Sequence, residues 1–199
     1  MSAPAAILIA KLMVPEKDEA HAHTDAKLKV EVESHNLMDG AARGASEGVM
    51  LALNIGAVLM AFVALIYLVN QGSTALFGHS FTEIMGWMFR PFAWLMGIPA
   101  QDVAAVGQLL GTKTVVNEFV AYASMSDMIQ AGTLSPRSVT IATYALCGFA
   151  NPGSLGILIA GLSGLVPERR KEITQLGLKS LVAGTLAVFM TACIAGILG

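Results

Sequence analysis

The chain has 199 residues, of which 55% are apolar and only 13% are charged. A soluble domain usually carries about a quarter charged residues, and a formal net charge of −2 offers no basic surface for nucleic acid. Uncharged stretches cover residues 48–82, 138–167 and 180–199, each long enough to cross the roughly 30 Å core of a bilayer as a helix. The composition therefore excludes a soluble globular enzyme and a nucleic-acid-binding protein, and predicts an all-α integral membrane protein.

The beginning of the chain combines a short apolar segment with a polar one. Residues 1–14 are apolar but too short to span a bilayer, and they resemble the end of a transmembrane helix whose beginning is missing. Residues 15–47 are polar, which predicts a cytoplasmic loop followed, from Asn36, by a small interfacial helix. His21 and His23 lie in this loop without further ligand spacing, so we expect no metal site there.

Two segments of different character follow. Residues 48–70 have Asn54 as their only strongly polar side chain before the end of the apolar run, which predicts a transmembrane helix of the scaffold. Residues 71–99 contain Trp87 and Trp94 among several phenylalanines. Aromatic side chains at this density favour an external loop with an interfacial helix, broken at Pro91. The alternative is that they pack in a core.

The central segment, residues 100–126, is apolar on either side of a polar middle. Lys113, Asn117 and Glu118 all lie near its centre and divide it into two halves, each too short to cross the bilayer. A segment of this kind is tolerated at membrane depth when its tip is covered by protein or lines a watery cavity. We therefore predict a re-entrant helical hairpin over residues 100–126.

The remaining chain predicts two further spans. Residues 136–166 start with a favourable cap and first-turn pair, Ser135 and Pro136, and are interrupted at Asn151–Ser154, where a proline removes a backbone donor. This pattern predicts a discontinuous transmembrane helix. A charged cytoplasmic loop at 167–175 and a last transmembrane helix at 176–199 complete the prediction.

Positive charge predicts how these pieces are oriented. Lysine and arginine concentrate in residues 11–47 and 167–175, which places both segments in the cytoplasm. If residues 48–70 cross from the cytoplasm to the outside, the loop at 167–175 can lie in the cytoplasm only if one of the later segments enters and leaves the membrane on the same side. Residues 100–126 are the candidate for this segment. A hairpin beside a discontinuous helix indicates a transporter's substrate site near the bilayer midplane.

Three runs resemble one known family. GTKTVVNEFVAY (111–122) matches the signature of the concentrative nucleoside transporters, YALCGFANPGSLGILIAGL (144–162) is similar to their discontinuous helix, and MTACIAGIL (190–198) to their last helix. The resemblance implies cation-coupled nucleoside symport by a homotrimer in the plasma (inner) membrane, without catalytic residues or cofactor. It also implies that the chain is the C-terminal half, that nucleobase contacts and the coupling-ion site lie in the other half, and that the ion is Na⁺ or H⁺, with sodium favoured.

The hairpin supplies two candidate site residues. A carboxylate inside a membrane is costly and by default functional, so Glu118 is the first of them; the alternative is a structural pair with Lys113. Asn117 either touches substrate or caps and braces the second hairpin helix. The resemblance implies that Glu118 accepts hydrogen bonds from ribose hydroxyls, a task that suits a carboxylate because it accepts from two donors.

The discontinuous helix supplies three more. Asn151 and Ser154 can cap its second half, and the resemblance implies that both also contact ribose. Phe149 in an apolar helix would normally be core, whereas the resemblance implies packing against base or sugar. The functional alternative to a symporter is a truncated, non-transporting membrane subunit, a scaffold fragment that associates with full-length subunits.

Overall fold

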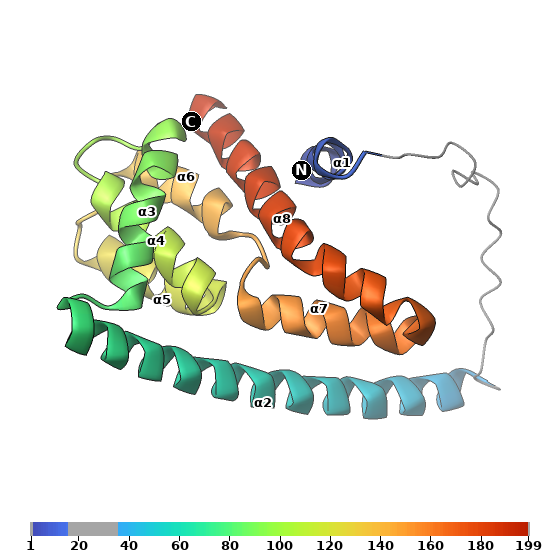
Figure 1. Ribbon diagram of the computed structural model, residues 1–199. Helices are drawn as coiled ribbons and strands as arrows, with labels where there is room; N and C mark the ends of the chain where they lie inside the picture. Colours follow the sequence, from blue (N-terminus) through green and yellow to red (C-terminus); the bar gives the residue numbers. More distant parts are fainter. Residues whose placement is uncertain (1, 16–35, 199) are drawn as a thin grey trace.

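The computed structural model describes residues 2–15 and 36–198, and regular structure in these ranges is entirely helical. The helices are α1 (Ser2–Met13), α2 (Leu37–Phe77), α3 (Phe81–Leu95), α4 (Val103–Val115), α5 (Glu118–Gln130), α6 (Pro136–Leu146), α7 (Pro152–Leu165) and α8 (Arg170–Leu198). Helices α3 to α6 form a group at one end of the molecule, α8 runs diagonally from this group past α7, and α2 lies along one side (Figure 1). Most of the predicted loop within 15–47, including His21 and His23, lies outside the described residues.

Helix α2 is one continuous element of 41 residues. It begins at Asn36, whose side chain accepts from the Asp39 amide at 2.8 Å, and it ends at Gly78, where φ is 74°. The expected boundary near residue 48, between an interfacial helix and a separate span, is therefore wrong. No proline interrupts the segment, and its alanines favour continuation of the helix through the boundary.

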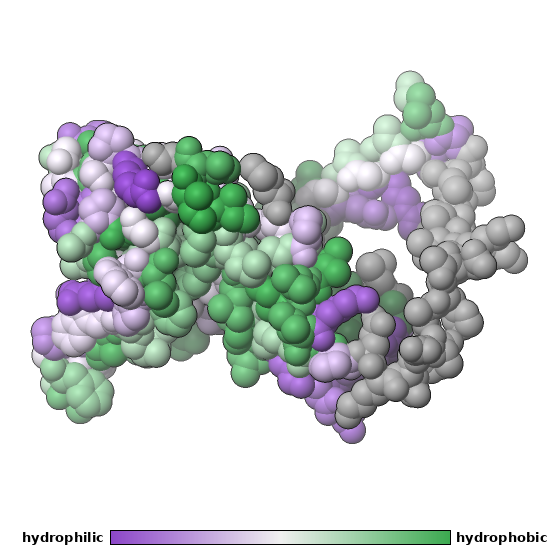
Figure 2. Space-filling view, turned by 90° about the horizontal axis from the view of Figure 1, so that it is seen from above, coloured by the Kyte–Doolittle hydropathy of each residue, from purple (hydrophilic) through white to green (hydrophobic). Residues whose placement is uncertain are grey.

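Two helices within the described residues are long and apolar enough to cross a membrane, α2 and the C-terminal stretch Pro167–Leu198. On α2, large apolar side chains such as Met60 and Leu68 are 71% and 66% exposed. Figure 2 shows hydrophobic residues across the middle of the visible face and hydrophilic residues towards its ends. An apolar surface of this extent is expected of a protein whose solvent is lipid.

The end of the chain also differs from its prediction. Pro167–Arg169 forms a 3₁₀ turn and α8 already begins at Arg170, so most of the predicted loop 167–175 is helical. Arg169 donates to both carboxylate oxygens of Glu172, at 2.9 and 2.7 Å, across this first turn. This local ion pair and the favourable acidic residue in the first turn explain why the charged residues extend the helix instead of ending it.

Helix α3 crosses α4 at very short range. An added Cβ at Gly111 would lie 2.5 Å from the Gly86 nitrogen, and one at Gly107 would lie 2.9 Å from the Gly86 oxygen. Gly107 and Gly111 form a small-xxx-small pair, the spacing that lets helix backbones meet closely in membranes. The predicted break at Pro91 is wrong, since α3 continues to Leu95 and its packing on α4 outweighs the single lost backbone hydrogen bond.

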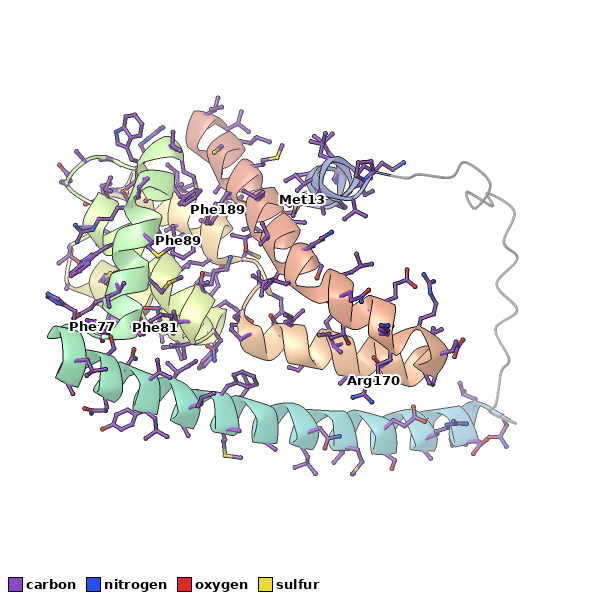
Figure 3. The ribbon with its side chains drawn as sticks, in the orientation of Figure 1. Met13, Phe77, Phe81, Phe89, Arg170 and Phe189 are labelled. Carbon is purple, nitrogen blue, oxygen red and sulfur yellow. The ribbon has the colours of Figure 1, made fainter. Side chains whose placement is uncertain are left out.

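The aromatic residues of this region divide between core and surface. Phe89 packs edge-on against Phe189 of α8, with ring centroids 6.2 Å apart (Figure 3). Trp87 and Trp94 are 43% and 65% exposed. The core interpretation is therefore correct for part of the set, and an interfacial position of the two tryptophans stays a prediction.

The close crossing can be tested with a pair of glycine variants. Gly111→Ala places a methyl group against backbone atoms of α3, so we expect it to lower the free energy of unfolding by about 1–3 kcal/mol. Gly161→Ala, on α7, is the matched control because an added Cβ there has no atom within 4 Å. Thermal unfolding of the detergent-purified variants measures both, and equal midpoints would contradict the crossing.

Candidate functional site

Helices α4 and α5 form the predicted helical hairpin, with its tip at Val116 and Asn117. The Asn117 side chain caps α5 by accepting from the Val120 amide at 2.9 Å, so the bracing role considered for it is present. The second helix runs to Gln130, four residues beyond the predicted end. Re-entry of this hairpin into the membrane stays a prediction.

The predicted discontinuity is present between α6 and α7, but four residues earlier than expected. Helix α6 ends at Leu146, residues 147–150 are non-helical, and Pro152 is already in the first turn of α7. Asn151 and Ser154 form a capping box, in which each side chain accepts from the other's backbone amide at 2.9 Å. An asparagine cap followed by proline is a helix start, and this pair therefore opens α7 and does not form the break.

A side-chain hydrogen bond joins the hairpin tip to the start of α7. Asn151 Nδ2 donates to Glu118 Oε2 at 2.9 Å, and Asn151 is 1% exposed. Its Oδ1 accepts from the Ser154 amide, so the amide donor must point towards the carboxylate. Since α5 and α7 both begin here, two partly positive helix ends are near the same negative charge and stabilise it.

The second charge of the tip, Lys113, has a different partner. Its Nζ donates to the carbonyl oxygen of Ala145 in the last turn of α6, at 2.8 Å, and the side chain is 1% exposed. Among the described residues, Lys113 and Glu118 therefore form no direct ion pair, although their opposite charges still act on each other. The cation of the tip contacts the carbonyl end of one half-helix, and the anion contacts the amide end of the other.

Phe149 and Ser154 border a hollow of about 280 Å³ between α7 and α8. Phe149 is 63% exposed, so the expectation that it is a core residue is wrong. Ser154 is buried, and its hydroxyl donates at the start of α7, to the carbonyl oxygen of Asn151 at 2.8 Å. Within the described part of the chain, Glu118 Oε1 has no bonding partner and Glu118 is half-buried, which leaves this oxygen available to a ligand.

The sequence reasoning missed a second connection between the hairpin and the discontinuous helix. Asp102, directly before α4 and 4% exposed, accepts from the amide and hydroxyl of Ser135 at 3.0 and 2.6 Å. It also accepts from the Ser138 hydroxyl at 2.6 Å. The hairpin is therefore bonded to α6 at its base as well as to the break at its tip. No spacing could have revealed this, because the partners are 33 and 36 residues apart.

The two cysteines lie in the break and on α8. Cys193 is half-buried, whereas Cys147 is exposed in the break, and both are free thiols.

Residues 1–196 match the family model described as the Na⁺ dependent nucleoside transporter C-terminus. The chain belongs to this family. The match includes the hairpin, the break and α8, so the predicted resemblance is confirmed, and the family is one of transporters and not of enzymes.

The relatives of this chain are longer than the chain itself. It is 45% identical to solute carrier family 28 member 3 of Mus musculus, covering 100% of this chain and 31% of the relative. It is 38% identical to the nucleoside permease NupC of Helicobacter pylori, covering 99% of this chain and 49% of the permease. The solved structure of CNTnw in an inward-facing substrate-bound state has a TM-score of 0.84 at 41% identity, covering 98% of this chain and 48% of that chain. The chain spans half or less of the length of each, and these likenesses confirm the all-α membrane transporter fold.

Proposed function

We propose that this chain forms the ribose-binding part of a sodium-coupled nucleoside symporter. The observation that carries the proposal is the bond between Glu118 and Asn151, because it holds one carboxylate at the meeting point of the hairpin tip and the break. The free oxygen of this carboxylate can accept from a hydroxyl of the sugar. The exposed ring of Phe149 adds an apolar surface on the same break. A polar group beside an apolar surface is expected of a site that binds a small molecule with polar and apolar parts, such as a nucleoside.

The five predicted site residues have distinct roles in this proposal. Glu118 accepts from ribose, Phe149 packs against sugar or base, and Asn117 offers the amide donors that its cap does not use. Asn151 and Ser154 shape the site mainly through the capping box, since most of their polar atoms are already bonded within the break.

The wider assembly is proposed on the family and its relatives. One relative, from Rattus norvegicus, is named sodium/nucleoside cotransporter 1. We propose that sodium is the coupling ion, that its site lies in the part of the relatives that this chain does not span, and that the protein works as a multi-pass homotrimer in the plasma membrane. A gradient of this ion can drive transport because ion and substrate are carried together as the protein changes between its outward- and inward-facing states.

Competition for uptake tests the proposal. A full-length protein that includes this chain, reconstituted in vesicles, should take up labelled uridine saturably. Unlabelled uridine should compete better than the analogue lacking the hydroxyl that Glu118 contacts. A hydrogen bond to a charged group contributes about 1.5–3 kcal/mol. The weaker analogue should therefore need a concentration roughly 10- to 100-fold higher than that of uridine to inhibit uptake by the same fraction. If the 2′-deoxy and the 3′-deoxy analogue both compete as well as uridine does, the ribose contact is contradicted. Absence of saturable uptake would favour the non-transporting subunit.

A further inference from the structure

The ammonium group of Lys113 lies in an unusual place for a charged group. Lysine side chains at membrane depth normally extend to the interface and keep the charge hydrated. Lys113 instead is 1% exposed, in the last turn of α4, and its Nζ donates to the Ala145 carbonyl oxygen at 2.8 Å. Burial of a charge is costly unless fixed dipoles or an opposite charge replace water, so the acceptor side of this contact must be specially suited to a cation.

The carbonyl end of α6 has that property. In a continuous helix the oxygen of Ala145 would accept from the amide of residue 149, but the break redirects the chain. Here the Cys147 amide donates to Tyr144 and the Gly148 amide to Leu146, at 3.3 and 2.7 Å. The C-terminal end of a helix carries partial negative charge, and such ends in discontinuous helices are where transporters coordinate cations.

The space around the ammonium is shaped to hold it. An added Cβ at Gly148 would lie 3.0 Å from Lys113 Nζ and 2.6 Å from Cγ2 of Val188 on α8. The glycine thus leaves a space in the break that the ammonium approaches from one side and α8 closes from another. This fit is independent of the hydrogen bond to Ala145.

We propose that Lys113 is a built-in cation of the discontinuous helix. Its ammonium occupies the position at the carbonyl end of α6 that a free cation would otherwise need, and it holds the hairpin tip against the break. The opposite end of the break is bonded to the anion of the same tip, through Asn151 and Glu118. The inference does not depend on which substrate the protein carries, because it concerns only contacts within this chain.

Chemical rescue of a truncated lysine tests the proposal. Lys113→Ala should lower the midpoint of thermal unfolding in detergent by roughly 5–20 °C. Propylammonium replaces the missing atoms including the charge, and should restore at least half of this loss when compared with sodium chloride at equal ionic strength. The neutral 1-propanol, which fills the same space, should not. Lys179→Ala, at an exposed position of α8, is the matched control and should respond to neither compound.

A second variant keeps the test decisive. Lys113→Met keeps most of the side-chain volume without the charge, so its midpoint should also fall and should not respond to propylammonium. If Lys113→Ala does not fold, this variant alone decides. The proposal is overturned if Lys113→Met is as stable as the wild type, if propylammonium has no effect on a folded Lys113→Ala, or if propanol restores its stability equally.

Discussion

Replacing Glu118 by glutamine should lower the apparent affinity for uridine by roughly tenfold to a hundredfold. Glutamine keeps the shape of the side chain, and its carbonyl oxygen can still accept from Asn151 Nδ2, so the hairpin tip should stay bonded to the break. What is lost is the charge of the acceptor offered to ribose, and a hydrogen bond to a charged group contributes about 1.5–3 kcal/mol. The concentration dependence of uridine uptake into vesicles measures this change.

Deoxy analogues separate a substrate contact from a disturbed hairpin. The wild type should discriminate against the analogue that lacks the contacted hydroxyl, and Glu118→Gln should lose most of this discrimination. The two changes remove the same interaction, and their effects therefore cannot add. Equal losses for uridine and for each deoxy analogue would exclude Glu118 from the substrate contacts.

Replacing Asn151 by aspartate should have a still larger effect at neutral pH, roughly a hundredfold or more in apparent affinity. Aspartate still caps α7, because one oxygen can accept from the Ser154 amide. The other oxygen replaces the donor that contacts Glu118, so two carboxylates face each other at hydrogen-bond distance. Asn151→Ser, which keeps a cap but adds no charge, is the matched control and should lose less.

This second prediction includes a pH dependence. Two carboxylates at such a distance repel each other, and a single shared proton restores a donor between them. The affinity of Asn151→Asp should therefore rise as the pH falls from about 8 to about 5, whereas that of Asn151→Ser should change in parallel with the wild type. A pH-independent deficit would show that the two side chains do not face each other.

The hairpin and the discontinuity could be predicted because both leave local signals in the sequence. Lys113 and Glu118 are charges in an apolar segment, and Ser135–Pro136 begins a helix by the ordinary rules of capping. The pair Asn151–Pro152 carries the same capping signal, yet it was interpreted as the break itself. The uncapped residues 147–150, which form the actual break, have no comparable signal.

The partners of the site residues could not be predicted, because they depend on contacts between distant segments. Lys113 bonds to a backbone carbonyl 32 residues away, and a carbonyl has no side-chain identity that a sequence pattern could reveal. Asp102 reaches Ser138 across 36 residues. The continuity of α2 was missed for a related reason, since polar composition alone does not end a helix that has no proline or competing cap.

Exchanging the donor and the acceptor shows whether Glu118 and Asn151 are bonded to each other. In the double variant Glu118→Gln with Asn151→Asp, the glutamine amide can donate to the aspartate, which still caps α7. Uridine affinity of the wild type, both single variants and the double variant completes the cycle. We predict that the double variant binds uridine roughly tenfold better than Asn151→Asp alone, which, together with the tenfold or larger loss of Glu118→Gln, is a coupling of about 3 kcal/mol. Losses of the two single variants that simply add in the double variant would contradict a direct bond between the hairpin tip and the broken helix.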